Sequence, residues 1–183
     1  MKTTFPALGL ALAAALVNTS VSANTGTINF EGKITSSTCP IEVVNPGDGA
    51  IGNLVKMGSV EASRFTAVGQ ALRGKDFALR VDNTGGKCIS TPDPIAKVRF
   101  DGTADATNPD YFAVGTAADD AAGVAIMIKD KSNNAIAPGD ESADYPLIDG
   151  VTDMRFYAYY VSTAATVQPG TASADVSFLV SFN

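Results

Sequence analysis

The side chains that carry most acid–base and metal chemistry are scarce in this chain. Its 183 residues include no histidine and two cysteines, and Asp and Glu outnumber Lys and Arg by 19 to 13. Histidine is the commonest metal ligand and general base near neutral pH, so Ser-His-Asp and Cys-His hydrolases, His-ligated zinc sites and facial-triad iron sites are excluded. The acidic balance argues against nucleic acid as a partner, because phosphate binding needs clustered basic side chains. We expect no catalytic residue, no metal and no cofactor.

Three polar motifs have simpler explanations than a site. Gly47 to Gly52 fits GxGxxG, but Asn45-Pro46 precedes it where a dinucleotide site needs a strand. Residues 130–134 space oxygen ligands like the start of a calcium loop but lack its later Gly and Glu, so we expect a hairpin turn. The acidic pairs at 119–120 and 140–141 lie in polar stretches, with no apolar pocket to raise the pKa of a carboxyl group as a glycosidase dyad needs.

Residues 1–23 have the pattern of a secretory signal. Lys2 provides a basic start, an apolar run extends from Phe5 to Val17, and Val21-Ser22-Ala23 fits the small-x-small cleavage pattern. The apolar run is shorter than the about 20 residues that a membrane-spanning helix needs. We therefore expect cleavage after Ala23, export, and a mature chain that begins at Asn24.

Export explains the two cysteines. Cys39 and Cys88 are the only thiols in the chain, and an oxidising compartment would join them in a disulfide. Their spacing is far from a redox CxxC motif, and two thiols without histidine make a poor zinc site. Closing a loop of about 50 residues would stabilise the fold by about 4 kcal/mol in the chain-entropy model.

The mature chain has an apolar period close to two, which predicts strands rather than helices. The clearest strand-like runs are 77–81, 96–100, 124–128 and 154–161, and turn residues cluster at 83–86, 101–102, 132–134, 138–139 and 169–170. One helical turn is expected around Ser59 to Phe65. Many short strands in one stretch without a linker or repeat predict a single all-β sandwich.

Both ends of the mature chain alternate between apolar and polar residues. Gly26, Ile28, Phe30 and Gly32 share one face of an N-terminal strand, and a C-terminal strand from Gly170 places Val176, Phe178, Val180 and Phe182 on one face. Chain ends fray unless they are tied down. We therefore expect both ends to pair with a sheet.

These features together resemble the subunits of chaperone–usher pili of the type 1 kind. The matching features are Gly26-x-Ile28-x-Phe30-x-Gly32 before the first cysteine, the Cys39 and Cys88 spacing, Gly170 at the fourteenth position from the end, and the penultimate Phe182. Segments 97–103 and 123–130 also look like the family's strands. The resemblance covers essentially the whole mature chain.

The resemblance implies an incomplete immunoglobulin-like β-sandwich that lacks its last strand. Residues 24–33 would be an N-terminal donor-strand extension and 34–183 the pilin domain. A periplasmic chaperone would cover the open sheet edge until, at the outer-membrane usher, the extension of the next subunit replaces it by β-strand addition. The product would be a homopolymeric cell-surface fimbrium that supports adhesion or biofilm formation.

The same resemblance implies roles for individual residues. The donor strand would use Asn24, Gly26, Ile28, Phe30 and Gly32, with Gly26 at the position that the family keeps free of a side chain. The C-terminal strand that lines the groove and binds the chaperone would use Gly170, Val176, Phe178, Val180, Phe182 and the carboxylate of Asn183. In an isolated chain we expect residues 24–33 either to project from the body or to fold back into the groove.

Alternatives differ in class. Within the family, a minor adaptor or terminator competes with a major shaft subunit, which the single-domain length favours over a two-domain adhesin. Outside the family, the chain could be a self-contained secreted β-sandwich that binds a carbohydrate or protein, and a hydrolase is a distant third. Tyr157 and Tyr159 lie opposite the apolar face of their strand. For them, ordinary strand surface is favoured over a contact between pilus turns.

Overall fold

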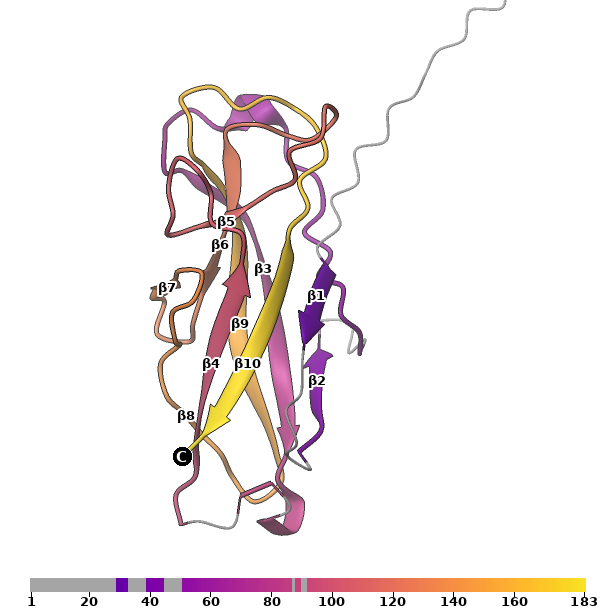
Figure 1. Ribbon diagram of the computed structural model, residues 1–183, viewed down its shortest axis with the longest axis vertical. Helices are drawn as coiled ribbons and strands as arrows, with labels where there is room; N and C mark the ends of the chain where they lie inside the picture. Colours follow the sequence, from indigo (N-terminus) through magenta and orange to yellow (C-terminus); the bar gives the residue numbers. More distant parts are fainter. Residues whose placement is uncertain (1–28, 33–38, 45–50, 87, 90–91) are drawn as a thin grey trace, which may run out of the picture.

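The protein is described by a computed structural model that covers residues 29–32, 39–44, 51–86, 88–89 and 92–183. The predicted signal, residues 24–28 of the predicted donor strand and most of the GxGxxG match lie outside the described residues. The described part is an elongated pair of sheets whose long strands run along the longest axis (Figure 1). No helix among the described residues has the length and apolar character needed to cross a membrane.

The first sheet contains the two ends of the described chain. Its strand order is β1, β10, β4, β8, and the bounds are β1 Asn29–Gly32, β10 Asp175–Phe182, β4 Ile95–Gly102 and β8 Tyr145–Pro146. The central pair, β10 and β4, is antiparallel, with Phe178 opposite Phe100. The strand that is last in sequence is therefore an inner strand of its sheet.

The second sheet forms the opposite layer. Its order is β2, β3, β9, β6, β5, and β7 adds to β6; the bounds are β2 Ile41–Val44, β3 Ala71–Asp82, β9 Val151–Ser162, β6 Val124–Lys129, β5 Phe112–Ala113 and β7 Ala135–Ile136. All of these pairings are antiparallel. Antiparallel sheets with one face buried show period-two patterns, so the four strand-like runs of the sequence fall within β3, β4, β6 and β9 as predicted.

Aromatic side chains join the two layers. The ring centroid of Phe156 lies 4.9 Å from that of Phe100 and 5.6 Å from that of Phe77. Phe100 comes from the first sheet and the other two from the second, and all three side chains are at most 1% exposed. Edge-to-face and offset aromatic pairs add to the free energy gained by burial, so this cluster fixes the spacing of the layers.

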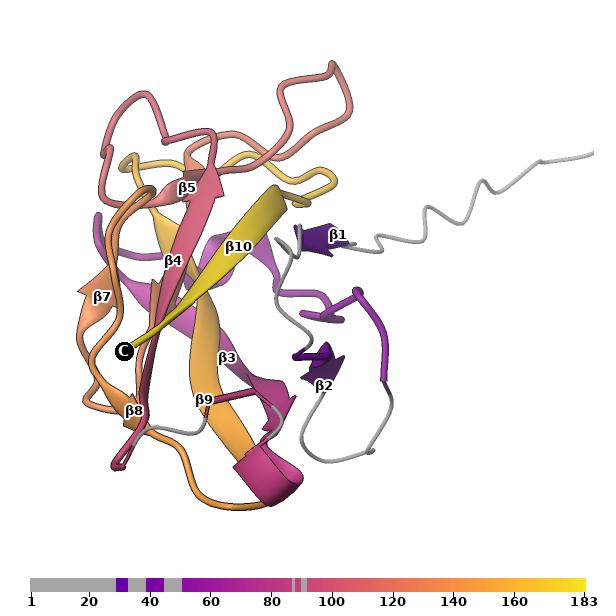
Figure 2. The same ribbon diagram turned by 60° about the horizontal axis from the view of Figure 1, so that its bottom comes forward.

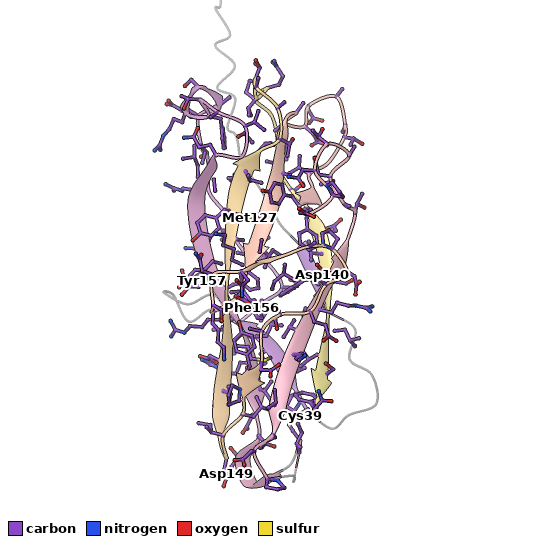
Figure 3. All side chains as sticks on the ribbon, turned by 90° about the vertical axis from the view of Figure 1, so that its left-hand side faces the viewer. Cys39, Met127, Asp140, Asp149, Phe156 and Tyr157 are labelled. Atoms are coloured by element: carbon purple, nitrogen blue, oxygen red, sulfur yellow. A yellow bond between two sulfur atoms is a disulfide. The ribbon has the colours of Figure 1, made fainter. Side chains whose placement is uncertain are left out.

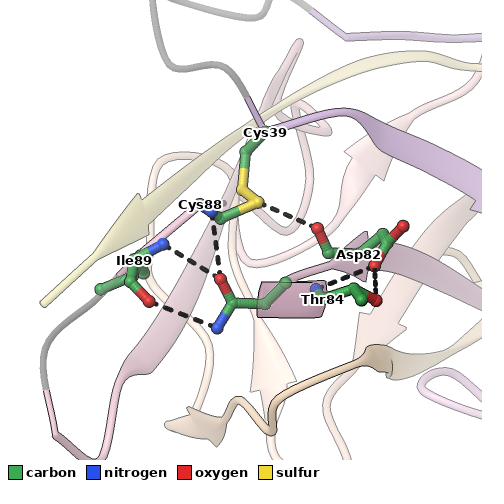
Figure 4. Close-up of a disulfide and its surroundings, with 6 residues drawn as sticks. Cys39, Asp82, Thr84, Cys88 and Ile89 are labelled. Atoms are coloured by element: carbon green, nitrogen blue, oxygen red, sulfur yellow. Dashed lines mark hydrogen bonds between the residues drawn. A yellow bond between two sulfur atoms is a disulfide. The ribbon is translucent and has the colours of Figure 1, made fainter. Parts of the chain in front are cut away.

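The disulfide between Cys39 and Cys88 is present, as the sequence predicted. It ties the segment before β2 to the loop after β3. The buried Asn83 braces that loop, because its side-chain oxygen accepts hydrogen bonds from the backbone N–H of Cys88 (3.1 Å) and of Ile89 (3.0 Å) (Figure 4). The turn predicted at 83–86 thus also anchors the disulfide.

The structure differs from two local expectations and refines a third. Asp101 and Gly102 do not form a turn, because β4 continues through them and Gly102 pairs with Val176. The expected helical turn is a short 3₁₀ helix, η1 (Ala62–Arg64), and a second, η2 (Thr84–Gly86), occupies the predicted turn after β3. The C-terminal strand begins at Asp175 and not at Gly170.

Candidate functional site: the free edge of strand β10

Strand β10 is paired unequally along its two edges. On one edge it pairs with β4 continuously from Val176 to Phe182, and Asn183 exchanges backbone hydrogen bonds with Ile95 (3.0 and 2.9 Å). On the other edge β1 covers only Asp175 to Phe178. Within the described residues, no strand pairs with that edge from Leu179 to Phe182.

The pairing of β1 with β10 is parallel, and the two strands lie side by side (Figures 1 and 2). The register places Asn29 opposite Asp175 and Gly32 opposite Phe178. The N-terminal segment therefore lies against the C-terminal strand of the same chain. Of the two arrangements expected for an isolated chain, the described part of the segment adopts the folded-back one. Its direction was not predicted, because alternation reports which face a residue occupies and not which way the strand runs.

Burial along β10 falls toward the end that lacks a partner strand. Val176 is 1% exposed and Phe178 is 7% exposed, whereas Val180 and Phe182 are only partly buried against the core. All four alternate on the core-facing side, as the sequence predicted. Buried apolar surface is the main favourable term in strand association, so an added strand gains most where these side chains are still open to water.

Half-buried apolar side chains are also found on the segments around the disulfide. Ile41, Cys88 and Ile89 pack against the core but are only partly buried, like Val180 and Phe182. Backbone groups without a partner and incompletely covered apolar side chains are the two features to which a further β-strand can add.

A small cavity lies at the other end of β10, before the strand begins. Its volume is about 60 Å³, and six of the residues that line it are Phe65, Val124, Tyr160, Val167, Gly170 and Ala172. The Tyr160 hydroxyl lies 3.3 Å from the carbonyl oxygen of Ala172 and 3.4 Å from that of Gly58. Burial raises the pKa of Tyr160, so its hydroxyl stays protonated and able to donate.

Gly170 approaches this cavity without belonging to the strand. A β-carbon there would lie 2.4 Å from the carbonyl carbon of Asp120 and 2.5 Å from the backbone nitrogen of Ala121. Two backbone hydrogen bonds of Thr171 keep Gly170 close to the 119–121 loop. The Thr171 N–H donates to the carbonyl oxygen of Asp119 (2.9 Å), and its carbonyl accepts from the N–H of Ala121 (2.8 Å). The lack of a side chain at position 170 is therefore explained by backbone packing.

Local hydrogen bonds account for two of the polar motifs set aside in the sequence. The buried Asp130 carboxylate accepts hydrogen bonds from the N–H groups of Ser132, Asn134 and Ala143, which forms the turn between β6 and β7. Asp120 accepts from the N–H of Ala117 (2.6 Å). Among the described residues, no group of three or more Asp, Glu, Cys or His side chains is placed to hold a metal ion.

Several contributors around β10 were not evident in the sequence. Tyr160 and the 119–121 backbone act through contacts with segments far away in the chain, at Gly58 and at Thr171. Asn83 acts locally, on the backbone of Cys88 and Ile89. The Asn-Thr-Gly-Gly run signalled a turn at Asn83 but not its contact with the disulfide loop. No local pattern identifies Tyr160, whose position on the core face of β9 only marked it as buried.

An elongated immunoglobulin-like sandwich with an incompletely paired last strand is the fold of pilin subunits. The Fimbrial protein family matches residues 28–183. The probable major fimbrial subunit LpfA of Escherichia coli O157:H7 is 35% identical over 181 residues, which covers 99% of this chain and 96% of that protein.

Solved structures agree with the sequence comparison. The Burkholderia pseudomallei antigen and type I fimbria protein BPSL1626 is 34% identical, with a TM-score of 0.52 over 88% of this chain and 97% of that one. The P pilus rod subunit PapA shares the fold, with a TM-score of 0.55 over 70% of this chain and 91% of that chain at 20% identity. The chain belongs to the Fimbrial protein family and is a structural subunit of a cell-surface fimbrium, which confirms the resemblance seen in the sequence.

Proposed function

We propose that this subunit polymerises head to tail by donor-strand exchange and has no enzymatic role. Residues 24–32 of one copy add to the free edge of β10 in the next, and Val176, Phe178, Val180 and Phe182 line the acceptor groove. Such a contact joins two different surfaces and does not close on itself, so it propagates as a filament. The observation that carries the proposal is the edge of β10 from Leu179 to Phe182, which no described strand covers.

The intramolecular pairing of β1 supports this donor role. Four residues of the N-terminal segment already lie beside β10, so the segment and the edge are compatible as neighbouring strands. A donor from another copy that spans 175–182 would also cover Val180 and Phe182. Fully burying a large apolar side chain stabilises by about 1.5–3 kcal/mol, so the longer pairing is favoured over the short one within the chain.

The same open edge would have to be covered by another protein during export. An unpaired edge flanked by apolar side chains is a template for aggregation unless it is covered. In the proposal, residues 1–23 direct export, a periplasmic chaperone lends a strand to β10 and binds the Asn183 carboxylate, and an outer-membrane usher exchanges that strand for the next donor. Gly170 contributes by packing against the 119–121 backbone just before the strand that lines the groove.

We infer a major shaft subunit rather than a minor adaptor or terminator. The support is the similarity to a relative that is named a probable major fimbrial subunit, matched over 96% of its length. That coverage leaves no room in the relative for a second lectin-like domain of the kind a tip adhesin carries.

Deletion of residues 24–32 tests the proposal. The truncated subunit should be captured by the chaperone as well as the full chain, and it should fail to form the SDS-resistant ladder of multimers. A self-contained sandwich would form no ladder even with residues 24–32 present. A full chain that never forms a ladder, or a truncated chain that still forms one, contradicts the proposal.

A further inference from the structure

The outer face of the second sheet carries an aromatic surface that strand exchange at β10 does not use. We call it the tyrosine face and define it by Tyr111, Met127, Lys129, Arg155, Tyr157 and Tyr159. Along β9, Phe156 points into the core while the neighbouring Tyr157 points out of the molecule (Figure 3). Cross-strand partners are directly opposite, Met127 with Tyr159 and Lys129 with Tyr157.

The tyrosine face is built on a hydrophobic cluster of its own. Ala125, Met127 and Val161 are at most 8% exposed and form a cluster separate from the main core, with Tyr111 and Tyr159 packed against it. The Tyr159 ring occupies the space above Gly74, where a β-carbon would lie 2.3 Å from its Cε1 atom. The rings of Tyr111 and Tyr159 are therefore held by packing before any partner binds, which lowers the entropy lost on binding.

Exposed area and charge remain available on this face. Tyr157 is 36% exposed, and the Lys129 ammonium lies 6.0 Å from the centroid of the Tyr159 ring. Neither Lys129 nor Arg155 forms a salt bridge with any of the described residues. On this side of the sheet, the carboxylate of Asp76 is opposite Tyr157. Asp153 is bound by Arg80, whose hydrogen bond lowers the pKa of that carboxyl group, and the nearby charge of Arg155 helps to lower it. Tyrosine and arginine are the side chains most enriched at protein–protein contacts.

A surface of complementary charge lies elsewhere on the same chain. Residues 137–144, which we call the acidic loop, carry Asp140, Glu141 and Asp144, all exposed, and the last two share the single cation Lys97 at 3.6 Å. The loop is pinned to β4, because Gly139 donates to the carbonyl of Phe100 and Ser142 to that of Val98, both at 2.8 Å. Asp140 lies on the opposite side of the view in Figure 3 from Tyr157.

We propose that the tyrosine face of one subunit binds the acidic loop of a second copy of this chain. The chain carries a formal charge of −6, so copies stacked side by side repel one another except where a basic surface meets an acidic one. The two surfaces lie on different parts of the molecule, so the contact is heterologous. This inference rests on the proposed polymerisation, because a lateral contact between subunits already joined in a filament winds that filament into a rod.

Electron microscopy of fibres from variants of the tyrosine face and of the acidic loop tests the assignment. Lys129→Glu and Tyr157→Ser should each lower the fraction of fibre length found as thick rods at least about tenfold in favour of thin fibres. Lys56→Glu makes the same charge change at an exposed position outside β6 and β9, the strands that carry most of the face, and should leave rods unchanged. Reversal of the loop by Asp140→Lys with Glu141→Lys should restore rods to the Lys129→Glu chain.

The SDS-resistant ladder separates this inference from the proposed polymerisation. The ladder depends on β10 and should be unchanged in all of these variants. A ladder that is absent from the wild-type chain contradicts both proposals. If the ladders are intact and the variant fibres keep the wild-type width, the tyrosine-face contact alone is overturned. If the Lys129→Glu fibres are thin and the reversed loop does not restore rods, the acidic loop is not the partner of that face.

Discussion

Gly170 packs directly on the backbone of Asp120: a β-carbon at position 170 would lie 2.4 Å from the carbonyl carbon of that residue. The contact locks the segment before β10 against the 119–121 loop and sets where β10 begins. Because the atoms it would meet belong to the backbone and not to a flexible side chain, they cannot move aside cheaply.

Replacing Gly170 with Ala should therefore destabilise the fold by about 1–3 kcal/mol, the usual cost of overpacking. Gly52→Ala is the matched control, because a β-carbon there meets nothing within 4 Å. Urea unfolding of both variants measures the difference in free energy of unfolding. Equal stability of the two would show that the 119–121 backbone yields, and the explanation for Gly170 would be wrong.

Removal of the disulfide by Cys39→Ala with Cys88→Ala should lower the free energy of unfolding by about 4 kcal/mol, since the bond closes a loop of about 50 residues in the unfolded chain. Asn83 braces the same loop, so Asn83→Ala should destabilise the oxidised chain as well, by about 1 kcal/mol for the lost partner of partly buried N–H groups. A double cysteine variant as stable as the oxidised wild type would contradict the first expectation.

Tyr145 should make stability fall at high pH. Burial raises the pKa of its phenol from about 10 to about 12, and the hydroxyl donates to the carbonyl oxygen of Arg155 (2.6 Å). The unfolded chain therefore loses this proton first, and the contribution to stability that is complete below pH about 10 declines as the pH rises toward about 12. Tyrosinate absorbance should show a late step near pH 12 that is smaller in the Tyr145→Phe variant. Complete titration of every tyrosine near pH 10 in the folded chain would contradict this.

Phe182 and Leu179 test which face of β10 lines the proposed acceptor groove. Phe182 is on the core-facing side and only partly buried, whereas Leu179 is 37% exposed on the other face. Phe182→Ser should abolish capture by the proposed periplasmic chaperone and so lower the amount of subunit in the periplasm, and Leu179→Ser should leave both unchanged. Normal accumulation of the Phe182 variant would count against the groove assignment.

Local patterns predicted the strands and the disulfide because these depend on alternation and on cysteine number. The core-facing set on β10 followed from period-two spacing, and the disulfide followed from two cysteines in an exported chain. The start of β10 was predicted too early, since the contact between Gly170 and the 119–121 backbone holds the chain out of the sheet there. Gly102 was assigned to a turn because a glycine after Asp usually marks one, whereas pairing with Val176 extends the strand.

The parallel direction of β1 could not have been predicted from its sequence. Alternation at 28–32 is the same for a parallel and an antiparallel strand, so only the position of the connected chain relative to β10 decides between them. The tyrosine face was visible as two outward tyrosines on one strand. The separate hydrophobic cluster beneath this face includes Tyr111, and the Tyr159 ring packs over Gly74. Both residues are far from β9 in sequence.

Complementation by a peptide tests the central claim most directly. A peptide of residues 24–33 is added to the mature chain that lacks residues 24–32, and the mixture is analysed without heating by SDS gel electrophoresis and by thermal unfolding. The account predicts a one-to-one SDS-resistant complex that unfolds at a higher temperature than the truncated chain, and no complex with a scrambled peptide of the same composition. A truncated chain that is already fully stable and binds neither peptide would contradict strand donation to β10.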